Sequence, residues 1–336
     1  MVIFLSVTLQ NCAMSVALAG MILLQIRENG FMIKTSILSL SVAVAASVLF
    51  ISCTGNDKNG NQPGKDAQEN KAPAREWKKP KNLQYHFQPS KEWVKRLKET
   101  PDSAGKYIIL SVNRVDLDHV RQLDSLLVPD DLSGDREAYM PFPLEAKGLK
   151  DIEKIVFFSY ATQSFAAYNY GQLVYAGPTS MGSKAHPTPE GLYFTNWKAE
   201  ETISTFDDEW VLRWNFNIEN KEGIGWHQYA LPGYPASHSC LRLLESDAKQ
   251  LYDWADQWKL KGSDSVVLKG TPVIVFGKYP FDGPKPWMAL AQDAHALDIK
   301  AGDLESLVSP HLEEIKATQE KRAATPKEDA AATKKS

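Results

Sequence analysis

The stretch GIGWHQYALPGYPASHSCLRL, residues 223–243, places two histidines and one cysteine in a short segment punctuated by Gly and Pro. These residues are His227, His238 and Cys240. A thiol is mostly protonated at neutral pH, and it becomes a strong nucleophile when a neighbouring imidazole takes its proton. A Cys/His pair is the smallest set of side chains that performs acyl transfer in this way. We therefore expect a reactive thiol at Cys240.

The other two cysteines of the chain lie far from this segment. Cys12 is in an apolar N-terminal run and Cys53 ends a second apolar run. An exported protein held together by disulfides carries paired cysteines. Once the N-terminus of this chain is processed and lipidated, at most one thiol is left. We therefore expect Cys240 to be unpaired.

The sequence on both sides of residues 223–243 has a β pattern. From Asp151 onward, KIVFFSY and QSFAAYNYGQLVYAG are rich in apolar, aromatic and β-branched residues, with a break at Asn169 and Gly171 that predicts a hairpin. Further on, Ser246 opens SDAKQLYDWADQW, where helical spacing of apolar residues predicts an amphipathic helix behind a Ser cap. GTPVIVFG, residues 270–277, predicts a short buried strand that closes the domain.

Several ordered motifs in this region resemble the YkuD family of L,D-transpeptidases. That family has a His, an intervening loop, and then Ser/Thr-His-Gly-Cys followed by an apolar residue and Arg; here His227 is followed by SHSCLR at residues 237–242. TPEG at residues 188–191 and GTPVIVF near the end extend the likeness over about 151–276. The resemblance implies a mainly β fold with α-helices. It would be a YkuD-like β-sandwich catalytic domain over residues 150–280 with packed helices, preceded by a small α/β region.

The resemblance also implies roles for single residues. Cys240 would be the nucleophile and His227 the general base, with its second ring nitrogen held by the backbone carbonyl of Gln228. His238 would complete the catalytic group and Ser237 would help to shape the site.

Two further residues carry over with a difference. Arg242 would orient the loop or a substrate carboxylate, and backbone amides near Ser239 and Cys240 would hold the oxyanion. Ser239 stands where the family has Gly, and the interval of 13 residues from His227 to Cys240 is shorter than the family commonly shows. If the family Gly has positive φ, Ser239 is strained by about 1 kcal/mol.

The implied reaction has two steps. Cys240 attacks the peptide bond between the L-centre of a diamino acid and a terminal D-Ala in a peptidoglycan tetrapeptide stem, which releases D-Ala and leaves a thioester. An amine of a neighbouring stem then forms a 3→3 crosslink or an equivalent amide. No cofactor is expected. No metal is expected either, because the sequence has no closely spaced His/Cys/carboxylate cluster that suits zinc.

Three alternatives stay open. With water as acceptor the same site would be an L,D-carboxypeptidase. Another peptidoglycan cysteine hydrolase, of the papain-like or NlpC type, needs a His long after the Cys, and the only later ones are His295 and His311 in an expected helical tail. The third alternative is an envelope-binding protein that has lost catalytic activity. Ser239 in place of Gly would be the sign of that loss, but Cys240, His227 and Arg242 are all retained.

The N-terminus predicts export and anchoring. Residues 32–52 have a basic start and an apolar core, and LFISC resembles a lipobox that ends at Cys53, the expected lipidation site. Residues 1–31 are interpreted as an upstream extension and residues 53–84 as a flexible tether. Thr54 is not the Asp that signals retention in the inner membrane, which favours a periplasmic domain lipid-anchored to the outer membrane.

The remaining regions are less informative. In residues 85–149, a small N-terminal region of unknown role, we expect a helix over 91–98 and a strand over 107–112, and residues 113–129 resemble the second half of a LysM glycan-binding module. Residues 281–336 are predicted to be a helical tail with a frayed end. Four tryptophans could either form the wall of a binding site or occupy core and sheet-face positions, and the second is expected. They are Trp197, Trp210, Trp214 and Trp226.

Charge excludes one class of partner. The formal net charge is -3 over 336 residues, so no nucleic-acid footprint is expected. The run from Asp207 to Glu209 is interpreted as a solvated turn and His186 as a solvated loop residue. The expected partners are peptidoglycan stem peptides and, through the lipid anchor, a membrane; the oligomeric state is not determined.

Overall fold

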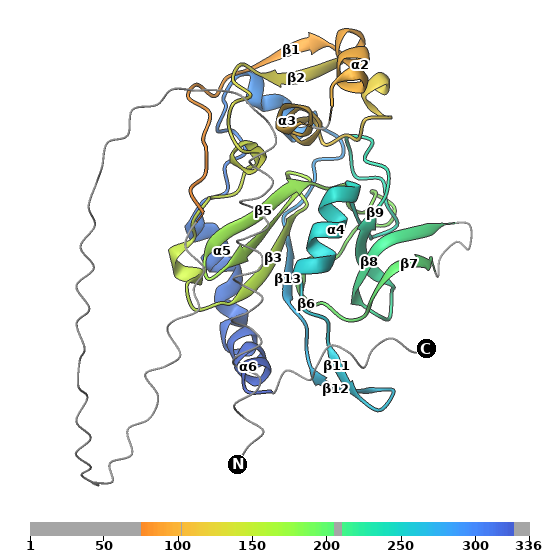
Figure 1. Ribbon diagram of the computed structural model, residues 1–336, viewed down its shortest axis with the longest axis vertical. Helices are drawn as coiled ribbons and strands as arrows, with labels where there is room; N and C mark the ends of the chain where they lie inside the picture. Colours follow the sequence, from red (N-terminus) through yellow and green to blue (C-terminus); the bar gives the residue numbers. More distant parts are fainter. Residues whose placement is uncertain (1–74, 102, 205–209, 326–336) are drawn as a thin grey trace, which may run out of the picture. The chain divides into compact units, whose positions relative to one another are not determined.

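The computed structural model describes residues 75–101, 103–204 and 210–325 (Figure 1). All of them belong to one compact unit, residues 65–336, which contains the four buried hydrophobic clusters of the described chain. The expected extension, signal peptide and lipidation site at Cys53, and the first part of the tether, lie outside the described residues. No helix within the described ranges is both long enough and apolar enough to cross a bilayer.

Two β-sheets form the larger part of the structure. The five-stranded sheet has the order β5-β4-β3-β13-β6 and the four-stranded sheet the order β10-β9-β8-β7. The strands of the first sheet are β3 (Lys154–Ser159), β4 (Ser164–Asn169), β5 (Gln172–Pro178), β6 (Gly191–Phe194) and β13 (Pro272–Phe276). Those of the second are β7 (Lys198–Ile203), β8 (Val211–Glu219), β9 (Ile224–Gln228) and β10 (Leu241–Leu243).

The two sheets share one hydrophobic core. Val156 and Phe158 of the first sheet lie in the same buried cluster as Phe216 and Trp226 of the second, and Phe158 and Trp226 are stacked with ring centroids 6.1 Å apart. Burial of this aromatic area is a large part of what holds the sandwich together. The predicted fold class, mainly β with packed helices, is confirmed.

The predicted hairpin and closing strand are both present. β4 and β5 pair antiparallel up to Asn169 and Gln172, and the two residues between them, Tyr170 and Gly171, have φ of 48° and 75°. Positive φ at both positions is the condition for a two-residue turn whose twist suits a hairpin. β13 lies between β3, to which it is parallel, and β6, to which it is antiparallel.

Helix α4 (Glu245–Trp254) packs on this core through Ala248 and Leu251. The expected cap is wrong: Ser246 lies inside the helix, the N-cap residue is Leu244, and no side chain caps the N-terminus. Acidic residues in the first turn take part of the role of a cap, since they interact favourably with the helix dipole.

The N-terminal region has the order β1 (Tyr85–Pro89), α2 (Ser90–Glu99), α3 (Ala104–Asn113) and β2 (Ser125–Pro129), with β1 and β2 antiparallel. The strand expected over 107–112 is wrong, because these residues lie in α3. Its Ile and Val residues are buried, and a short apolar run does not distinguish a strand from a buried helix. The Ser103 side chain accepts a hydrogen bond from the Lys106 backbone N–H at 3.4 Å and marks the helix start.

A buried ion pair joins this region to α4. The Arg136 guanidinium donates to Asp247 Oδ1 at 2.7 Å and to the Ala176 carbonyl at 3.0 Å, and the Tyr175 hydroxyl donates to the same Asp247 oxygen at 2.8 Å. Asp247 is fully buried. The network therefore fixes α4 against β5 and the segment that contains Arg136.

The end of the expected tether is packed. The Lys78 backbone N–H donates to Asp135 at 3.0 Å and the Lys81 backbone N–H donates to Asp131 at 2.8 Å. Trp77 packs against a buried cluster. Residues 75–84 thus belong to the folded unit, whereas the sequence predicted a tether up to residue 84. The difference is due to these backbone hydrogen bonds, which cannot be predicted from amino-acid composition.

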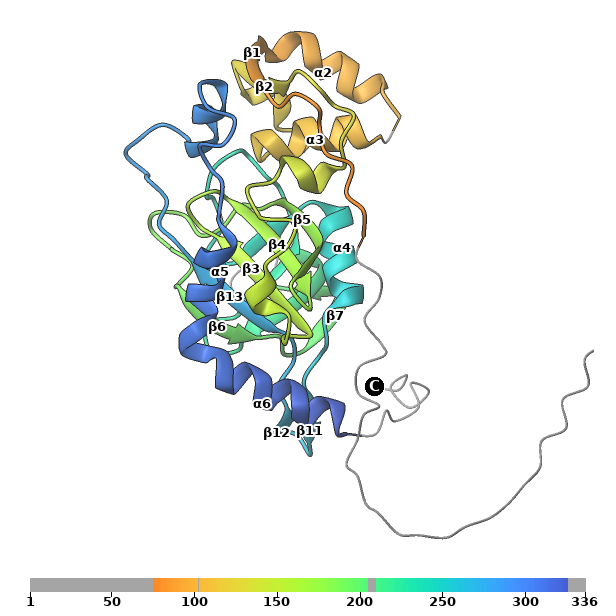
Figure 2. The same ribbon diagram turned by 90° about the vertical axis from the view of Figure 1, so that its left-hand side faces the viewer.

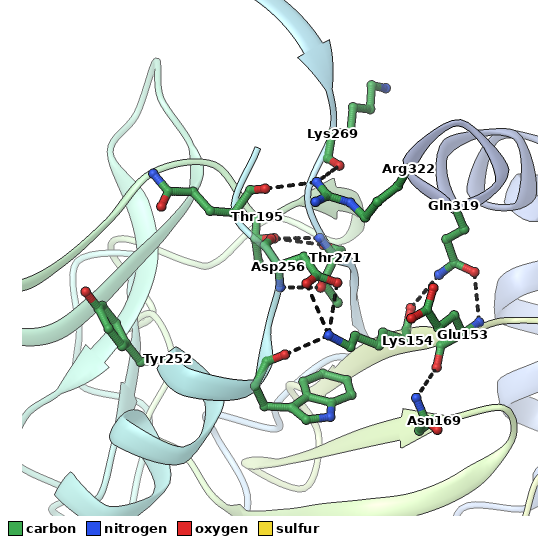
Figure 3. Close-up of polar contacts among 12 residues, drawn as sticks. Glu153, Lys154, Asn169, Thr195, Tyr252, Asp256, Lys269, Thr271, Gln319 and Arg322 are labelled. Atoms are coloured by element: carbon green, nitrogen blue, oxygen red, sulfur yellow. Dashed lines mark hydrogen bonds and ion pairs between the residues drawn. The ribbon is translucent and has the colours of Figure 1, made fainter. Parts of the chain in front are cut away.

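The C-terminal helices α5 (Ala301–Val308) and α6 (Leu312–Ala323) cover the outer face of the five-stranded sheet (Figure 2). Near the end of α6, the Gln319 side chain accepts from the Glu153 backbone N–H and donates to the Lys154 carbonyl, both at 2.8 Å, and Arg322 donates to two backbone carbonyls (Figure 3). The helical tail is therefore docked as far as it is described, while residues 326–336 lie outside the described part.

The remaining elements are short. They are the 3-10 helices η2 (Val120–Gln122), η3 (Arg136–Tyr139), η4 (Lys147–Leu149), η5 (Pro286–Ala291) and η6 (Ser309–His311), and the hairpin of β11 (Lys259–Lys261) and β12 (Ser265–Leu268).

Candidate functional site

The pairing of β9 with β10 brings His227 and the residues after Cys240 together. β10 runs parallel to β9, with Leu241 opposite Trp226 and Arg242 opposite His227. Leu241 and Trp226 are fully buried in the core between the sheets. Because side chains alternate along a strand, His227 and Arg242 lie on the other face.

That face borders a cavity of about 330 Å³. Residues from β7, β8 and β9 and from the Cys240 loop line it: Trp197, Thr202, Ile203, Ser204, Trp210, Leu212, Asn215, Asn217, Asn220, Glu222, Gly223, His227, Tyr229, Ser237, His238, Cys240 and Arg242. The volume is within the usual range of small-molecule sites. More than half of the lining residues are polar or charged, and the rest include the rings of Trp197, Trp210 and Tyr229.

The His227 ring is held in one tautomer. Its Nδ1 lies 3.0 Å from the carbonyl oxygen of Gln228, so Nδ1 carries the proton and Nε2 is the acceptor. His227 is only 4% exposed, and burial lowers its pKa to about 4 although the hydrogen bond to Gln228 opposes the shift. The imidazole is therefore neutral at pH 7. The Gln228 carbonyl contact expected from the sequence is present.

The Cys240 thiol is also neutral in this structure. Sγ donates a hydrogen bond to the Gly223 carbonyl at 3.7 Å. Burial raises the thiol pKa, while a hydrogen bond from the Gly225 backbone and the charge of Arg242 act to lower it. A neutral imidazole and a neutral thiol therefore line the same cavity.

The Ser237 hydroxyl is used inside the loop. It donates to the Cys240 carbonyl at 2.6 Å, and the Ser237 backbone is tied to Met181 and Ser183. Ser237 is 1% exposed. It therefore fixes the conformation of the loop that contains Cys240.

Ser239 has the backbone conformation that favours Gly. Its φ is 72°, and its hydroxyl lies 3.1 Å from the Pro187 carbonyl and 3.3 Å from that of His186. The Thr188 hydroxyl donates to the Ser239 carbonyl at 2.8 Å. These contacts from the TPEG loop hold Ser239 in the left-handed region.

The Arg242 side chain lies along the cavity wall. Its guanidinium carbon is 4.6 Å from the centre of the Tyr229 ring, and its backbone pairs with Ser180. Within the described ranges it has no carboxylate in ion-pair distance. Its positive charge therefore acts on the cavity and on the thiol.

His238, which lines the cavity, has two aromatic neighbours. The rings of His238 and His186 have centroids 4.3 Å apart, and the Trp210 ring lies 5.4 Å from that of His238. His186 was expected to be a solvated loop residue. His186 is exposed in a loop and is not among the residues that line the cavity, which agrees with that expectation, although its ring contacts that of His238.

Asn215 is a second residue that the sequence analysis missed. It is 4% exposed, it lines the cavity, and its amide nitrogen has no hydrogen-bond partner among the described residues. The register between β8 and β9 shifts between Arg213 and Phe216, and Trp214 in this bulge has φ of 54°. Bulges redirect side chains beside binding sites.

The four tryptophans divide between the two expected positions. Trp226 is in the core and Trp214 packs against it, whereas Trp197 and Trp210 line the cavity. The run from Asp207 to Glu209 lies outside the described residues. Within the described ranges, no group of three or more His, Cys, Asp or Glu side chains is arranged to hold a metal ion.

The β-sandwich thus places His227 of β9 and Cys240, which directly precedes β10, on the wall of one cavity. Residues 153–275 match the YkuD family, described as the L,D-transpeptidase catalytic domain, and this part of the chain is a YkuD-type domain. The resemblance seen in the sequence is confirmed.

Solved structures of L,D-transpeptidases are similar to the same part of the chain. The enzyme from Stackebrandtia nassauensis is 23% identical over 38% of this chain and 57% of its own, with a TM-score of 0.31. That from Mycobacterium smegmatis is 21% identical over 38% and 59%, with a TM-score of 0.30. The match thus spans less than two thirds of either structure. No curated protein sequence matches the chain.

Proposed function

We propose that the domain is a cysteine L,D-transpeptidase that acts on peptidoglycan tetrapeptide stems. The observation that carries the proposal is the His227 ring, whose Nδ1 is held by the Gln228 carbonyl while His227 and Cys240 line one cavity. This tautomer leaves Nε2 able to accept a proton from the thiol. The family match over residues 153–275 supports the reaction class.

In the first half-reaction Cys240 attacks the carbonyl that joins the L-centre of the stem's diamino acid to the terminal D-Ala. The Sγ–C bond forms as the thiol proton moves to Nε2 of His227. The C–N bond then breaks and the same proton passes to the amine of D-Ala, which leaves. A thioester on Cys240 is the product.

In the second half-reaction the side-chain amine of a neighbouring stem attacks the thioester. His227 takes a proton from the amine, the C–N bond forms, and the Cys240 thiolate leaves and recovers that proton. The result is a 3→3 crosslink. Water in place of the amine gives an L,D-carboxypeptidase with the same residues.

The charge that develops on the carbonyl oxygen needs donors. Within the described residues, the backbone N–H groups of Ser239 and Cys240 donate to no other protein group, which supports them as the oxyanion site. Arg242 raises the positive potential of the cavity and would bind the terminal carboxylate of the stem. His238 also lines the cavity and would contact the substrate.

The test is incubation of the 65–336 segment with a disaccharide tetrapeptide, followed by mass spectrometry. We expect release of D-Ala and a crosslinked dimer, both abolished in Cys240→Ala and His227→Gln and unchanged in His295→Gln, which alters an exposed histidine outside the cavity. D-Ala release without a dimer would favour the carboxypeptidase. Products that survive Cys240→Ala would refute the thioester route.

The lipid anchor is proposed from the sequence alone. Cys53 follows a lipobox-like segment, and acylation there would place the domain in the periplasm on the outer membrane. Metabolic labelling of the full chain with a fatty acid should mark the wild type and not Cys53→Ala. Equal labelling of both would refute it.

A further inference from the structure

A second cavity lies away from the catalytic one. Its volume is about 550 Å³, and the two cavities have no lining residue in common. It is lined by residues from three segments that are distant in the sequence, residues 79–85, 138–144 and 290–300, and by Arg114. The volume is that of a small-molecule site.

Arg114 is the unusual group in its wall. The side chain is 1% exposed, with Nε donating to the Thr162 carbonyl and NH1 to the carbonyls of Ser111 and Val112, at 2.7–3.1 Å. Nη2 has no hydrogen-bond partner among the described residues, although the guanidinium carbon lies 5.3 Å from the centre of the Trp287 ring. A buried charged donor without a partner is costly, and here no carboxylate compensates it.

The backbone of Arg114 adds a second cost. It ends α3 in the left-handed conformation, with φ of 57°, where Gly or Asn is favoured. Burial lowers the pKa of its guanidinium to about 10, so it is still charged at pH 7. A cation kept in this position is explained if an anion completes its coordination.

The rest of the lining is amphipathic. The apolar side chains include Leu83, Met140, Phe142, Leu290 and Leu297. Lys79, Lys81 and Lys300 also line the cavity, and Asp298, its one carboxylate among the lining residues, is paired with His295 at 2.8 Å. The charge balance of the wall therefore favours an anion with an apolar body.

We propose that this cavity binds an amphipathic carboxylate, with its head group at Arg114 and its acyl chain along the apolar wall. The Tyr85 hydroxyl borders the same space, and Tyr85 and Arg114 are close enough to interact electrostatically. Apolar side chains supply most of the contact area, which suits an unbranched chain because it brings no further polar group that needs a partner.

The test uses decanoate as the probe and the 65–336 segment, with isothermal titration calorimetry as the readout. We expect one decanoate per chain, with decanol and acetate each binding at least about tenfold more weakly, because each lacks either the charged or the apolar contact. Equal binding of decanol would overturn the anion site. Equal binding of acetate would reduce it to an adventitious ion.

Two variants locate the site. Arg114→Met should weaken decanoate about tenfold or more, since it removes a charge-assisted hydrogen bond. Ala294→Trp, which fills the cavity without changing Arg114, should abolish binding, whereas Ala296→Trp, two residues further along and outside the lining, should not.

If Arg114→Met does not fold, the comparison of Ala294→Trp with Ala296→Trp tests the location of the site. Decanoate that fails to bind the wild type, or that binds Ala294→Trp as tightly as Ala296→Trp, would overturn the proposal. Circular dichroism of each variant confirms that its fold is intact.

Discussion

His227 on β9 and Arg242 on β10 are register partners in a parallel strand pair. The same pair buries Trp226 and Leu241 on its other face. The core between the sheets therefore determines the position of the His227 ring and of the Arg242 cation that acts on the Cys240 thiol. Chemistry and stability are coupled at this pair, and the first two predictions follow from it.

The buried His227 ring should make stability depend on pH. Its folded pKa, about 4, is below the ordinary value of 6.5, so the ring contributes fully above pH 6.5 and the contribution is lost as the pH falls towards 4. The loss amounts to about 3 kcal/mol. Urea unfolding at several pH values should show it in the wild type and in His295→Gln, but not in His227→Gln. An identical pH dependence in all three would contradict it.

The rate of Cys240 alkylation should reach half of its maximum at an alkaline pH. Because burial raises the thiol pKa, the rate with iodoacetamide should rise at a higher pH than for a free cysteine peptide. Arg242→Met should move the midpoint further up, since the charge that lowers the pKa is gone. Arg213→Met, which alters an exposed pair with Glu201, should not. The 65–336 segment suits the assay because Cys240 is its only cysteine.

Asn215 should show opposite effects on stability and activity. Asn215→Leu removes a buried donor without a partner, so the free energy of unfolding should increase by about 1 kcal/mol, while KM should rise about tenfold if the amide binds substrate. Asn217 is the matched control on the same strand. Its amide bonds Asn196 and Glu219, so Asn217→Leu should destabilise. An unchanged KM in Asn215→Leu would remove Asn215 from the substrate site.

Ser239→Gly should stabilise the fold by up to about 1 kcal/mol, because Gly adopts positive φ without strain. The gain is reduced by the lost hydroxyl contacts with residues 186 and 187. Ser265→Gly, in the middle of a short exposed hairpin, should instead destabilise slightly. Thermal unfolding of both variants measures the contrast, and a loss of stability in Ser239→Gly would mean that the hydroxyl contacts outweigh the strain.

Arg136→Met should cost about 3–5 kcal/mol, since it leaves Asp247 buried without its cation. Lys249→Met breaks the exposed pair with Asp253 and should have a much smaller effect, because water and salt screen a surface ion pair. Urea unfolding distinguishes them. Equal costs would show that the Arg136 pair adds nothing beyond a surface contact.

Motif order in the sequence was sufficient for the fold class and for the place of the cysteine loop. Apolar alternation around Asn169 and Gly171 determined the hairpin, and SHSCLR with His227 identified the segments that meet. The register of a parallel pair could not be predicted, because it depends on which side chains the opposite sheet buries. The strand predicted over 107–112 was wrong for a related reason. These residues are buried on every side of the helix, so their sequence lacks the periodicity that distinguishes a helix from a strand.

By itself the sequence determined the nucleophile candidate, its candidate base and the YkuD-type class of the domain, since these depend on residue types in a fixed order. The tertiary structure alone decided which polar groups lack partners. Asn215 lines the cavity that contains His227 and Cys240, next to a bulge at Trp214, and Arg114 is buried with a nitrogen that has no hydrogen-bond partner among the described residues. Whether a polar group is satisfied depends on all of its neighbours in space, and order along the chain does not specify those neighbours.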